Sequence, residues 1–498
     1  MMVPVQYSET TVAGVASARR LAGRQRPGLP SVQLTVLLAL SALVATAQQP
    51  NFIVIFADDL GYGDLGVYGS TTIRTPNLDR MAAEGMRFTD FYATAPFCSP
   101  SRASLLTGRY PVRAGVPYVL FPTELTGLPP AEITIAEILS DEGYATAAIG
   151  KWHLGWPKPF RAQRHGFDFF FGLPYSNDML KWTPDEDFRP QHAFWELPLL
   201  ENDRIVEAPV NQHTLTRRYT EQAVRFIEQN RNRPFFLYFP HTFPHNPQYA
   251  SEDFEGRSPH GLFADTVEEL DWSVGEVLRT LRDLDLDERT LVVFTSDNGP
   301  TGSGGRWGIR SDGGSTGGLR GRKGNTFEGG MREPGIFRWP GKIAAGVETS
   351  EPASILDLLP TLAELGGAQA PADRVIDGRS IADLLTGKAT ELPQDPFFYY
   401  FGVQLQAIRL GNWKLFPRQA EPPERSASLW YLQNPELHER HHRLRAEPEL
   451  YDLAADPAET RNLASSRPEI VQRLGSIARR FDEGMQRDKR RPVYLDGQ

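Results

Sequence analysis

The stretch NFIVIFADD, residues 51–59, decides the fold class of this chain. Apart from Asn51, residues 51–56 are aliphatic or aromatic, and the apolar run stops abruptly at Asp58 and Asp59. A continuous apolar run of this length suits a strand that is buried on both faces of a sheet. We therefore expect residues 51–56 to form a central strand of a mainly parallel sheet.

Runs of the same kind recur further along the chain, and amphipathic helical patterns separate them. We expect further strands at residues 144–149, 234–239 and 290–295. We expect helices at residues 76–85, 133–143, 216–229 and 265–284. Strands that alternate with helices in this way predict an α/β fold, in which helices flank a mainly parallel central sheet.

The pattern changes after Leu385, where shorter strand signals replace the long apolar runs. Strands are predicted at residues 397–401, 406–410, 413–416 and 449–453, and a last helix is predicted from about Pro468. These signals indicate a smaller α+β C-terminal subdomain over residues 386–498, which follows a larger domain over residues 48–385. The polar, His-rich segment 418–447 is interpreted as a mobile insertion in the subdomain.

The N-terminal segment has the features of a secretory signal peptide. Four arginines precede the apolar run 34–44, which ends in the small residues Ala45-Thr46-Ala47. The run is too short to span a bilayer comfortably, although an uncleaved anchor is the alternative. We expect cleavage after residue 47, no stable membrane insertion afterwards, and a secreted or periplasmic protein. The chain contains no N-x-[ST] glycosylation signal, which favours a bacterial origin.

Loss of residues 1–47 removes four arginines and one glutamate, so the net charge falls from −9 to −12. A chain this acidic is not expected to bind nucleic acid.

Polar residues follow each of the four long predicted strands at its carboxyl end. They are Asp58-Asp59, Lys151-Trp152-His153, the pair His241 and His245, and Asp297-Asn298. Solvent exposure would explain any one of these groups. In open α/β sheets, however, ligands bind outside the carboxyl ends of the strands. Together, the four groups predict one converging polar site.

Cys98 is the single cysteine of the chain, so it cannot form a disulfide within an exported protein. Taken alone, a lone cysteine is most often a small buried hydrophobe. Its neighbours, CSPSRASLLTGR at residues 98–109, predict a short helix that begins directly after it and stops at Gly108. The N-terminus of a helix favours an anion, and Arg102 lies one turn further on the same face.

The sequence CSPSR, continued by ASLLTGR, resembles the C-x-P-x-R signature of the sulfatases in the alkaline-phosphatase-like superfamily. Companion motifs occur in the same order as in that family: DDLGYGD from Asp58, GKWHLG from Gly150, SDNG from Ser296 and GRKGNTFEGGMREP from Gly321. The resemblance covers residues 51–464 and is closest in style to the branch of arylsulfatase A and N-acetylgalactosamine-6-sulfatase.

This resemblance implies that a maturase oxidises Cys98 to Cα-formylglycine, whose hydrated form supplies an oxygen nucleophile to sulfur. It also implies a bound divalent cation, with Ca²⁺ preferred over Mg²⁺. By motif match, its ligands are Asp58, Asp59, Asp297, Asn298 and the formylglycine derived from Cys98. Arg102, Lys151 and Lys323 match the cations that stabilise the sulfate oxygens, which need fixed positive charge in the transition state.

Two histidines match the proton-transfer groups of the family. His153, in KWHLG, resembles the histidine that hydrogen-bonds the nucleophile, a role that suits imidazole near neutral pH. The histidine that donates to the leaving oxygen is assigned to His245, in His245-Asn246-Pro247, with His241 as its rival. His241 is otherwise a candidate for a structural or substrate-pocket residue, and Ser176 in GLPYSND is a candidate for a sulfate contact.

Two other functions compete with sulfate ester hydrolysis. One is phosphonate or phosphate ester hydrolysis, because these esters share the tetrahedral geometry of sulfate. The other is a catalytically dead, sugar-binding homologue, which predicts damaged motifs that the sequence does not show. The expected substrate is a sulfated carbohydrate first and an aryl sulfate second. The segments expected to select it are the loops 155–163, 178–195 and 302–318 and the C-terminal insertion 418–447.

Overall fold

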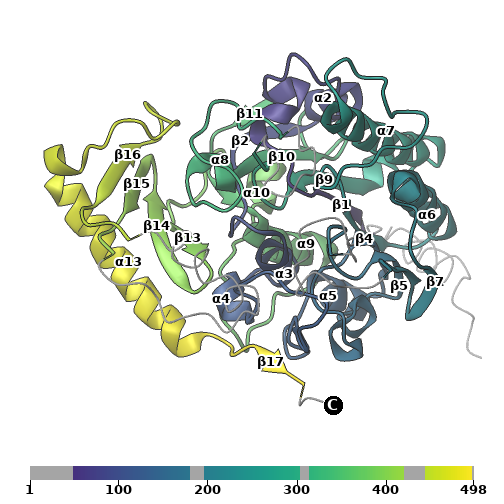
Figure 1. Ribbon diagram of the computed structural model, residues 1–498, viewed down its shortest axis with the longest axis horizontal. Helices are drawn as coiled ribbons and strands as arrows, with labels where there is room; N and C mark the ends of the chain where they lie inside the picture. Colours follow the sequence, from purple (N-terminus) through teal and green to yellow (C-terminus); the bar gives the residue numbers. More distant parts are fainter. Residues whose placement is uncertain (1–48, 180–195, 303–312, 420–443, 496–498) are drawn as a thin grey trace, which may run out of the picture. The chain divides into compact units, whose positions relative to one another are not determined.

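The computed structural model describes residues 49–179, 196–302, 313–419 and 444–495 (Figure 1). The predicted signal peptide lies outside these ranges, as do most of the predicted substrate loops 178–195 and 302–318 and most of the predicted insertion 418–447. Among the described residues, no helix combines the length and the apolar character that crossing a membrane requires.

The central sheet has 11 strands within the described residues, and β1 (Asn51–Ala57) lies in its middle. It pairs in parallel with β8 (Phe235–Pro240) on one side and with β9 (Thr290–Ser296) on the other. Beyond β8, the parallel pairing continues through β4 (Ala145–Lys151) to β5 (Phe169–Leu173). The predicted fold class, an α/β fold with a mainly parallel central sheet, is confirmed.

The outer strands of the sheet mix both directions. Next to β9, β10 (Arg332–Arg338) runs antiparallel and pairs in turn with β2 (Met86–Tyr92). The short edge strands are β6 (Leu199–Glu201), β7 (Arg204–Glu207), β11 (Val347–Thr349) and β12 (Ala353–Ser354).

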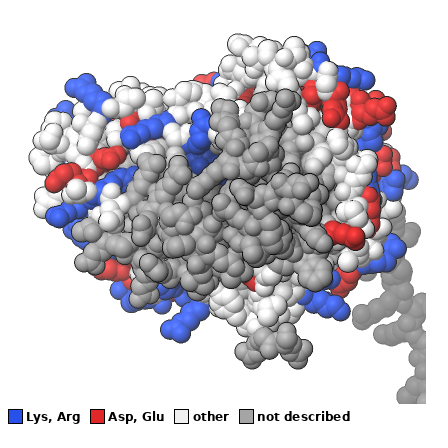
Figure 2. Space-filling model, in the orientation of Figure 1, with Lys and Arg blue, Asp and Glu red and all other residues white. Residues whose placement is uncertain are grey.

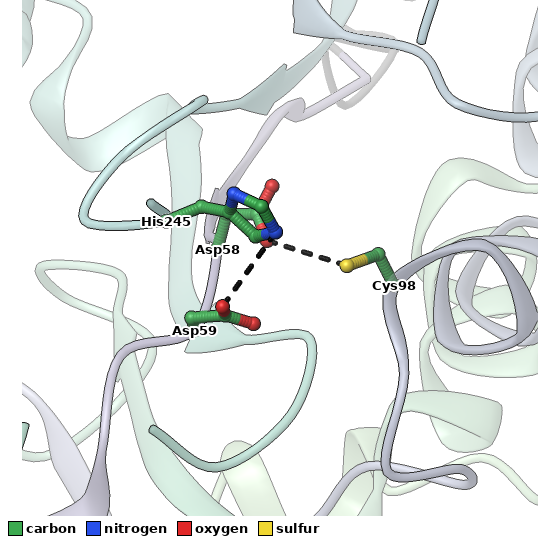
Figure 3. Close-up of side chains that lie close together, drawn as sticks. All are labelled: Asp58, Asp59, Cys98 and His245. Atoms are coloured by element: carbon green, nitrogen blue, oxygen red, sulfur yellow. Dashed lines mark hydrogen bonds and ion pairs between the residues drawn. The ribbon is translucent and has the colours of Figure 1, made fainter. Parts of the chain in front are cut away.

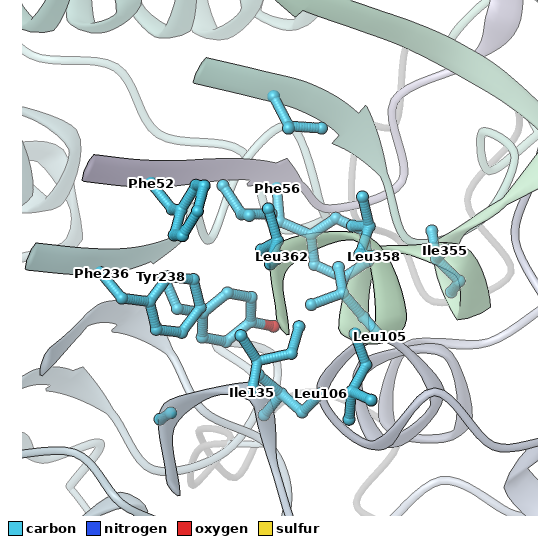
Figure 4. Close-up of a cluster of buried hydrophobic side chains, with 14 of the residues drawn as sticks. Phe52, Phe56, Leu105, Leu106, Ile135, Phe236, Tyr238, Ile355, Leu358 and Leu362 are labelled. Atoms are coloured by element: carbon cyan, nitrogen blue, oxygen red, sulfur yellow. The ribbon is translucent and has the colours of Figure 1, made fainter. Parts of the chain in front are cut away.

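Helices cover both faces of the sheet, because the side chains of β1 alternate between two cores. Phe52, Val54 and Phe56 point into one core, and Ile53 and Ile55 point into the other. The first core packs against α3 (Cys98–Thr107), α5 (Ile135–Asp141), α9 (Leu358–Gly366) and α10 (Ala382–Leu385), as Figure 4 shows in part. The second packs against α2 (Pro76–Ala83), α6 (Leu215–Gln229) and α7 (Leu262–Asp283).

The C-terminal part forms a separate antiparallel sheet covered by one long helix (Figure 1). Its strands are β13 (Phe397–Phe401), β14 (Gln404–Leu410), β15 (Trp413–Phe416) and β16 (Glu449–Asp452). The helix α13 (Pro468–Asp488) stacks Phe481 on Phe398 of β13. The chain then returns to the catalytic part, where β17 (Val493–Tyr494) pairs with β3 (Thr126–Gly127).

The long predicted strands and helices occur within a few residues of their predicted bounds, and so do the C-terminal strands. The boundary at residues 385 and 386 stays a prediction. Sequence patterns missed β2, β5 and β10, together with α9 and the short helices α4 (Pro111–Ala114) and α8 (Glu328–Met331). Strand β10 was not predicted because Arg332 and Glu333 in its first half are charged, and Pro334 and Gly335 interrupt a strand pattern.

The surface carries charges of both signs. On the described part of the face in Figure 2, Lys and Arg side chains are interspersed with Asp and Glu. Mixed charge of this kind is ordinary for a globular protein.

Candidate active site

The carboxyl ends of the central strands bring the candidate residues together. Asp58 and Asp59 follow β1, Asp297 and Asn298 follow β9, and Lys151 is the last residue of β4. Their side chains are all buried. The helix α3 approaches with its N-terminus, so that Cys98, its first residue, faces the two carboxylates of β1 (Figure 3).

Arg102 ties these elements to one another. Its Nη2 donates to Asp58 Oδ2 at 3.1 Å and to Asp297 Oδ2 at 2.9 Å, and its Nη1 donates to the carbonyl of Lys151 at 2.6 Å. The Lys151 ammonium lies 2.5 Å from Asp58 Oδ2. Helical spacing explains the geometry, because Arg102 follows Cys98 by four residues and therefore shares its face of α3.

The two carboxyl groups that share Arg102 have opposite pKa shifts. Burial by itself raises the pKa of Asp58, but the charges of Lys151, His245 and Arg102 outweigh burial and hold that pKa below its ordinary range. Burial and the neighbouring charge of Asp58 raise the pKa of Asp297 to about 7. The cations of the pocket therefore leave Asp297 incompletely neutralised, and a carboxyl oxygen of this kind suits a hard divalent cation.

Asp59 pairs with the third side-chain cation of the pocket, Lys323. Lys323 Nζ donates to Asp59 Oδ1 at 2.6 Å and to Oδ2 at 2.8 Å, and Asn298 Nδ2 donates to Oδ1 at 2.7 Å. The backbone of Asp59 has a φ of 62°, in the left-handed region that non-glycine residues seldom adopt. Strain of this kind is concentrated at functional sites, and here it accompanies a side chain held by three contacts.

Cys98 is poorly suited to act as an ordinary thiol nucleophile. The residue is 2% exposed, and its Sγ donates to Asp58 Oδ1 at 3.5 Å and lies 3.6 Å from Lys323 Nζ. Burial, followed by the negative charge of Asp58, raises the pKa of the thiol far above its ordinary value. Because the thiolate is the reactive form of cysteine, the unmodified side chain would be almost inert at neutral pH.

A group of potential metal ligands lies at the centre of the pocket. One ligand atom each from Asp58, Asp59, Cys98 and His245 lies within 4.8 Å of the others (Figure 3). The predicted ligand Asp297 borders this group, since its Oδ1 accepts from the backbone N–H of Asp59 at 3.1 Å. Among the described residues, Asn298 Oδ1 is buried and has no hydrogen-bond partner. Carboxylate and amide oxygens of this kind fit a hard cation such as Ca²⁺ or Mg²⁺.

One ring nitrogen of His153 is hydrogen-bonded, and the other has no hydrogen-bond partner among the described residues. Its Nε2 lies 2.9 Å from the carbonyl of Leu120, which only accepts hydrogen bonds, so Nε2 carries the proton. The opposite nitrogen, Nδ1, is buried and has no partner among the described residues. In the neutral ring this nitrogen holds a lone pair. Burial, together with the charge of Lys151, lowers the pKa of His153 and favours that neutral form.

The two rival histidines after β8 lie in different surroundings. His245 Nε2 lies 3.7 Å from Asp59 Oδ2, inside the potential ligand group. The ring of His241 instead packs on Phe239, with ring centroids 4.3 Å apart, and burial lowers its pKa to about 3. Within the described residues, the His241 ring contacts Phe239 and Tyr219 and none of the other candidates, so the placement favours His245 for chemistry.

Ser176 is brought to the site as predicted, because Lys151 Nζ donates to its Oγ at 3.0 Å. The next residue, Asn177, contacts His245 and was not singled out from the sequence. The only sequence signal that could have indicated Asn177 is its position next to Ser176 in GLPYSND.

With this geometry established, comparison with known proteins identifies the family. The model of the sulfatase family matches residues 50–368, and the model of the C-terminal region of aryl-sulfatase matches residues 392–492. The chain belongs to the sulfatase family. It is therefore a sulfuric ester hydrolase.

Relatives of this sulfatase include members of the branch that its motifs resemble. It is 43% identical to human arylsulfatase A, over 89% of this chain and 90% of the relative. It is 42% identical to N-acetylgalactosamine-6-sulfatase of the dog, over 76% of this chain and 74% of the relative. Among solved structures, the PsFucS1 sulfatase from Pseudoalteromonas sp. matches with a TM-score of 0.78 and 27% identity, over 94% of this chain and 97% of that chain.

Proposed function

We propose that this sulfatase hydrolyses sulfate esters through a formylglycine derived from Cys98. The observation that carries the proposal is the position of Cys98, which is buried at the start of α3 between Asp58 and Lys323 as a thiol of strongly raised pKa. A thiol so placed is a poor nucleophile, and oxidation to the aldehyde would remove its sulfur. The hydrated aldehyde supplies an oxygen nucleophile at the same position.

A divalent cation fits the oxygen-rich end of the pocket, and Ca²⁺ is proposed ahead of Mg²⁺. Asp58, Asp59, Asp297 and Asn298 would hold it, and the formylglycine oxygen would complete the protein ligands. The raised pKa of Asp297 and the unpartnered Oδ1 of Asn298 support this assignment. When bound, the cation supplies Lewis-acid polarisation and lowers the pKa of a coordinated hydroxyl.

The remaining side chains have roles that follow from their contacts. Lys151, Lys323 and Arg102 concentrate positive charge around Cys98, where the sulfate oxygens must lie during attack. Ser176, held by Lys151, contacts sulfate beside them. The free Nδ1 of His153 accepts the proton of the attacking hydroxyl, and His245 donates a proton to the leaving oxygen.

We propose a sulfated carbohydrate as the substrate class, in an exported protein that a formylglycine-generating maturase acts upon. The similarity to N-acetylgalactosamine-6-sulfatase supports a sugar substrate, and the similarity to arylsulfatase A keeps an aryl sulfate as the second candidate. The predicted signal peptide supports export. Hydrolysis of a phosphate or phosphonate ester is the competing reaction.

One preparation can test the modification and the substrate together. The protein is produced with and without a maturase, and the peptide that spans Cys98 is analysed by mass spectrometry. We expect the thiol to be replaced by an aldehyde only with the maturase. Turnover of sulfated sugars, aryl sulfate and the matching phosphate ester should follow the converted fraction and vanish in Cys98→Ala. An active enzyme with an unmodified Cys98, or a phosphate ester turned over faster than every sulfate, would refute the proposal.

A further inference from the structure

Asn177 is a fully buried amide that lies behind His245, on the side away from the carboxylates. Its Oδ1 lies 3.1 Å from His245 Nδ1. Its Nδ2 donates to Gln212 Oε1 at 3.0 Å and to the carbonyl of Pro247 at 2.9 Å. The three contacts come from two other parts of the chain, so the amide connects the loop after β5 with the turn that begins at Gln212 and with the segment that follows β8.

The partners of Asn177 fix which way its amide points. Gln212 Oε1 and the carbonyl of Pro247 are oxygens that accept hydrogen bonds, so both protons of the Asn177 amino group are used. Turning the amide over would place its oxygen against two other oxygens and lose both bonds. The carbonyl oxygen of Asn177 is therefore held toward the His245 ring.

This orientation also fixes the tautomer of His245. An amide oxygen only accepts hydrogen bonds, so Nδ1 of His245 must carry a proton to bond it. In the neutral ring, Nε2 then holds the lone pair, and Nε2 is the nitrogen on the side of Asp59, 3.7 Å from its Oδ2. The bond from Nδ1–H to Asn177 is unchanged when Nε2 takes up or gives away a proton, so the ring keeps one orientation throughout.

We propose that Asn177 is a positioning residue, which holds His245 with Nε2 directed at the leaving oxygen of the substrate. The inference rests on the proposed role of His245 as proton donor and extends it to a residue that touches no reacting atom. Second partners of catalytic imidazoles act in this way when they fix the tautomer of the ring. Without the amide, His245 can rotate or adopt the other tautomer, and proton donation fails although the ring is present.

Dependence on the leaving group separates positioning from mere support of the fold. Phenyl sulfate has a poor leaving group that needs a proton, whereas 4-nitrophenyl sulfate has a good one that needs it less. We expect Asn177→Leu to lower kcat for phenyl sulfate at least about tenfold more than kcat for 4-nitrophenyl sulfate, with little change in KM. His245→Ala should show the same preference, and the double variant should be no worse than His245→Ala alone.

Asn230→Leu is a matched control, because Asn230 is also buried and its amide makes two side-chain hydrogen bonds, to Phe226 and Arg233 at the end of α6. It should lower both rates equally or not at all. Asn177→Ala repeats the test with a smaller side chain if the leucine variant does not fold.

Equal loss for the two substrates in the Asn177 variants, or additive effects of Asn177 and His245, would overturn the inference while the proposed function stands. If the wild-type protein hydrolyses no sulfate ester, the proposed function is wrong. If His245→Ala shows no dependence on the leaving group, the proposed role of His245 as proton donor is wrong. Either result also overturns the inference about Asn177.

Discussion

Replacing Lys414 with methionine should disturb the active site from the C-terminal sheet. Lys414 lies on β15 and is fully buried. Its Nζ donates to the carbonyl of Thr326 at 2.8 Å and forms ion pairs with Glu328 at 2.9 Å and Glu459 at 3.0 Å. Thr326 stands three residues after Lys323 in the chain, so this one ammonium anchors the segment that carries an active-site cation.

The size of the effect follows from the charges that the variant leaves behind. Removing one partner of a buried ion pair typically costs about 3–5 kcal/mol, because the other charge remains buried without compensation. Burial, together with the charge of Glu328, already raises the pKa of Glu459 to about 7, so this carboxyl can take up a proton at modest cost. We therefore expect Lys414→Met to lower the free energy of unfolding by about 3 kcal/mol at neutral pH. A displaced Lys323 should also reduce kcat/KM by roughly 10- to 100-fold.

Urea denaturation followed by tryptophan fluorescence measures the free energy of unfolding, and turnover of an aryl sulfate measures kcat/KM. Lys388→Met is the matched control, since Lys388 forms an exposed pair with Asp383 at 3.4 Å. Such a surface pair contributes at most ~1 kcal/mol. The double variant Lys414→Met/Glu459→Gln should recover part of the stability, because it removes one of the two carboxylates that lose their ion-pair partner. A Lys414→Met variant with the wild-type denaturation midpoint and wild-type kcat/KM would refute the reasoning.

Three further outcomes are expected. Unconverted Cys98 should react with a chromogenic disulfide at least about tenfold more slowly in folded protein than in urea, and equal rates would contradict its burial. Chelation should abolish turnover and lower the thermal midpoint, with Ca²⁺ restoring both better than Mg²⁺; unchanged activity after verified metal removal would exclude the proposed cation site. Burial lowers the pKa of His165 from 6.5 to about 4, so the unfolded chain binds more protons between these values. The free energy of unfolding should therefore fall by up to about 3 kcal/mol as the pH drops from 6.5 to 4. In His165→Leu, the slope of this free energy against pH should correspond to about one bound proton fewer.

The fold could be predicted from the sequence where both faces of a strand are apolar. Residues 51–56 predicted a central strand because successive side chains, such as Phe52 and Ile53, point into two different cores, so that no polar side chain follows Asn51 in the run. Strand β10 gave no such signal, because its polar residues are compensated by partners far away in the chain. Arg338 Nη1, for example, donates to Asp287 Oδ1 at 2.9 Å, and the backbone N–H of Gly335 donates to the Tyr68 hydroxyl at 2.8 Å.

The candidate site could be predicted for a related reason. Residues such as Asp58, Asp297 and Lys151 stand where predicted strands end, so their convergence follows from the topology of a parallel sheet. The chemistry expected of Cys98 came from its resemblance to a family signature and not from spacing. Asn177 and Lys414 could not be recognised in the sequence, because their importance depends entirely on tertiary contacts with His245 and Thr326.

The anchoring of the Lys323 segment by Lys414 and Glu459 has a consequence for the order of events during synthesis. The anchor cannot form until Glu459 has left the ribosome, long after Cys98 has emerged. At typical elongation rates of ~5–20 residues per second, the chain between them takes roughly 20–70 s to make. Until then, the lysine that lies over the cysteine in the finished protein has no anchor on the C-terminal sheet. A modifying enzyme that must reach a side chain only 2% exposed at the end of folding therefore has its opportunity in the growing chain.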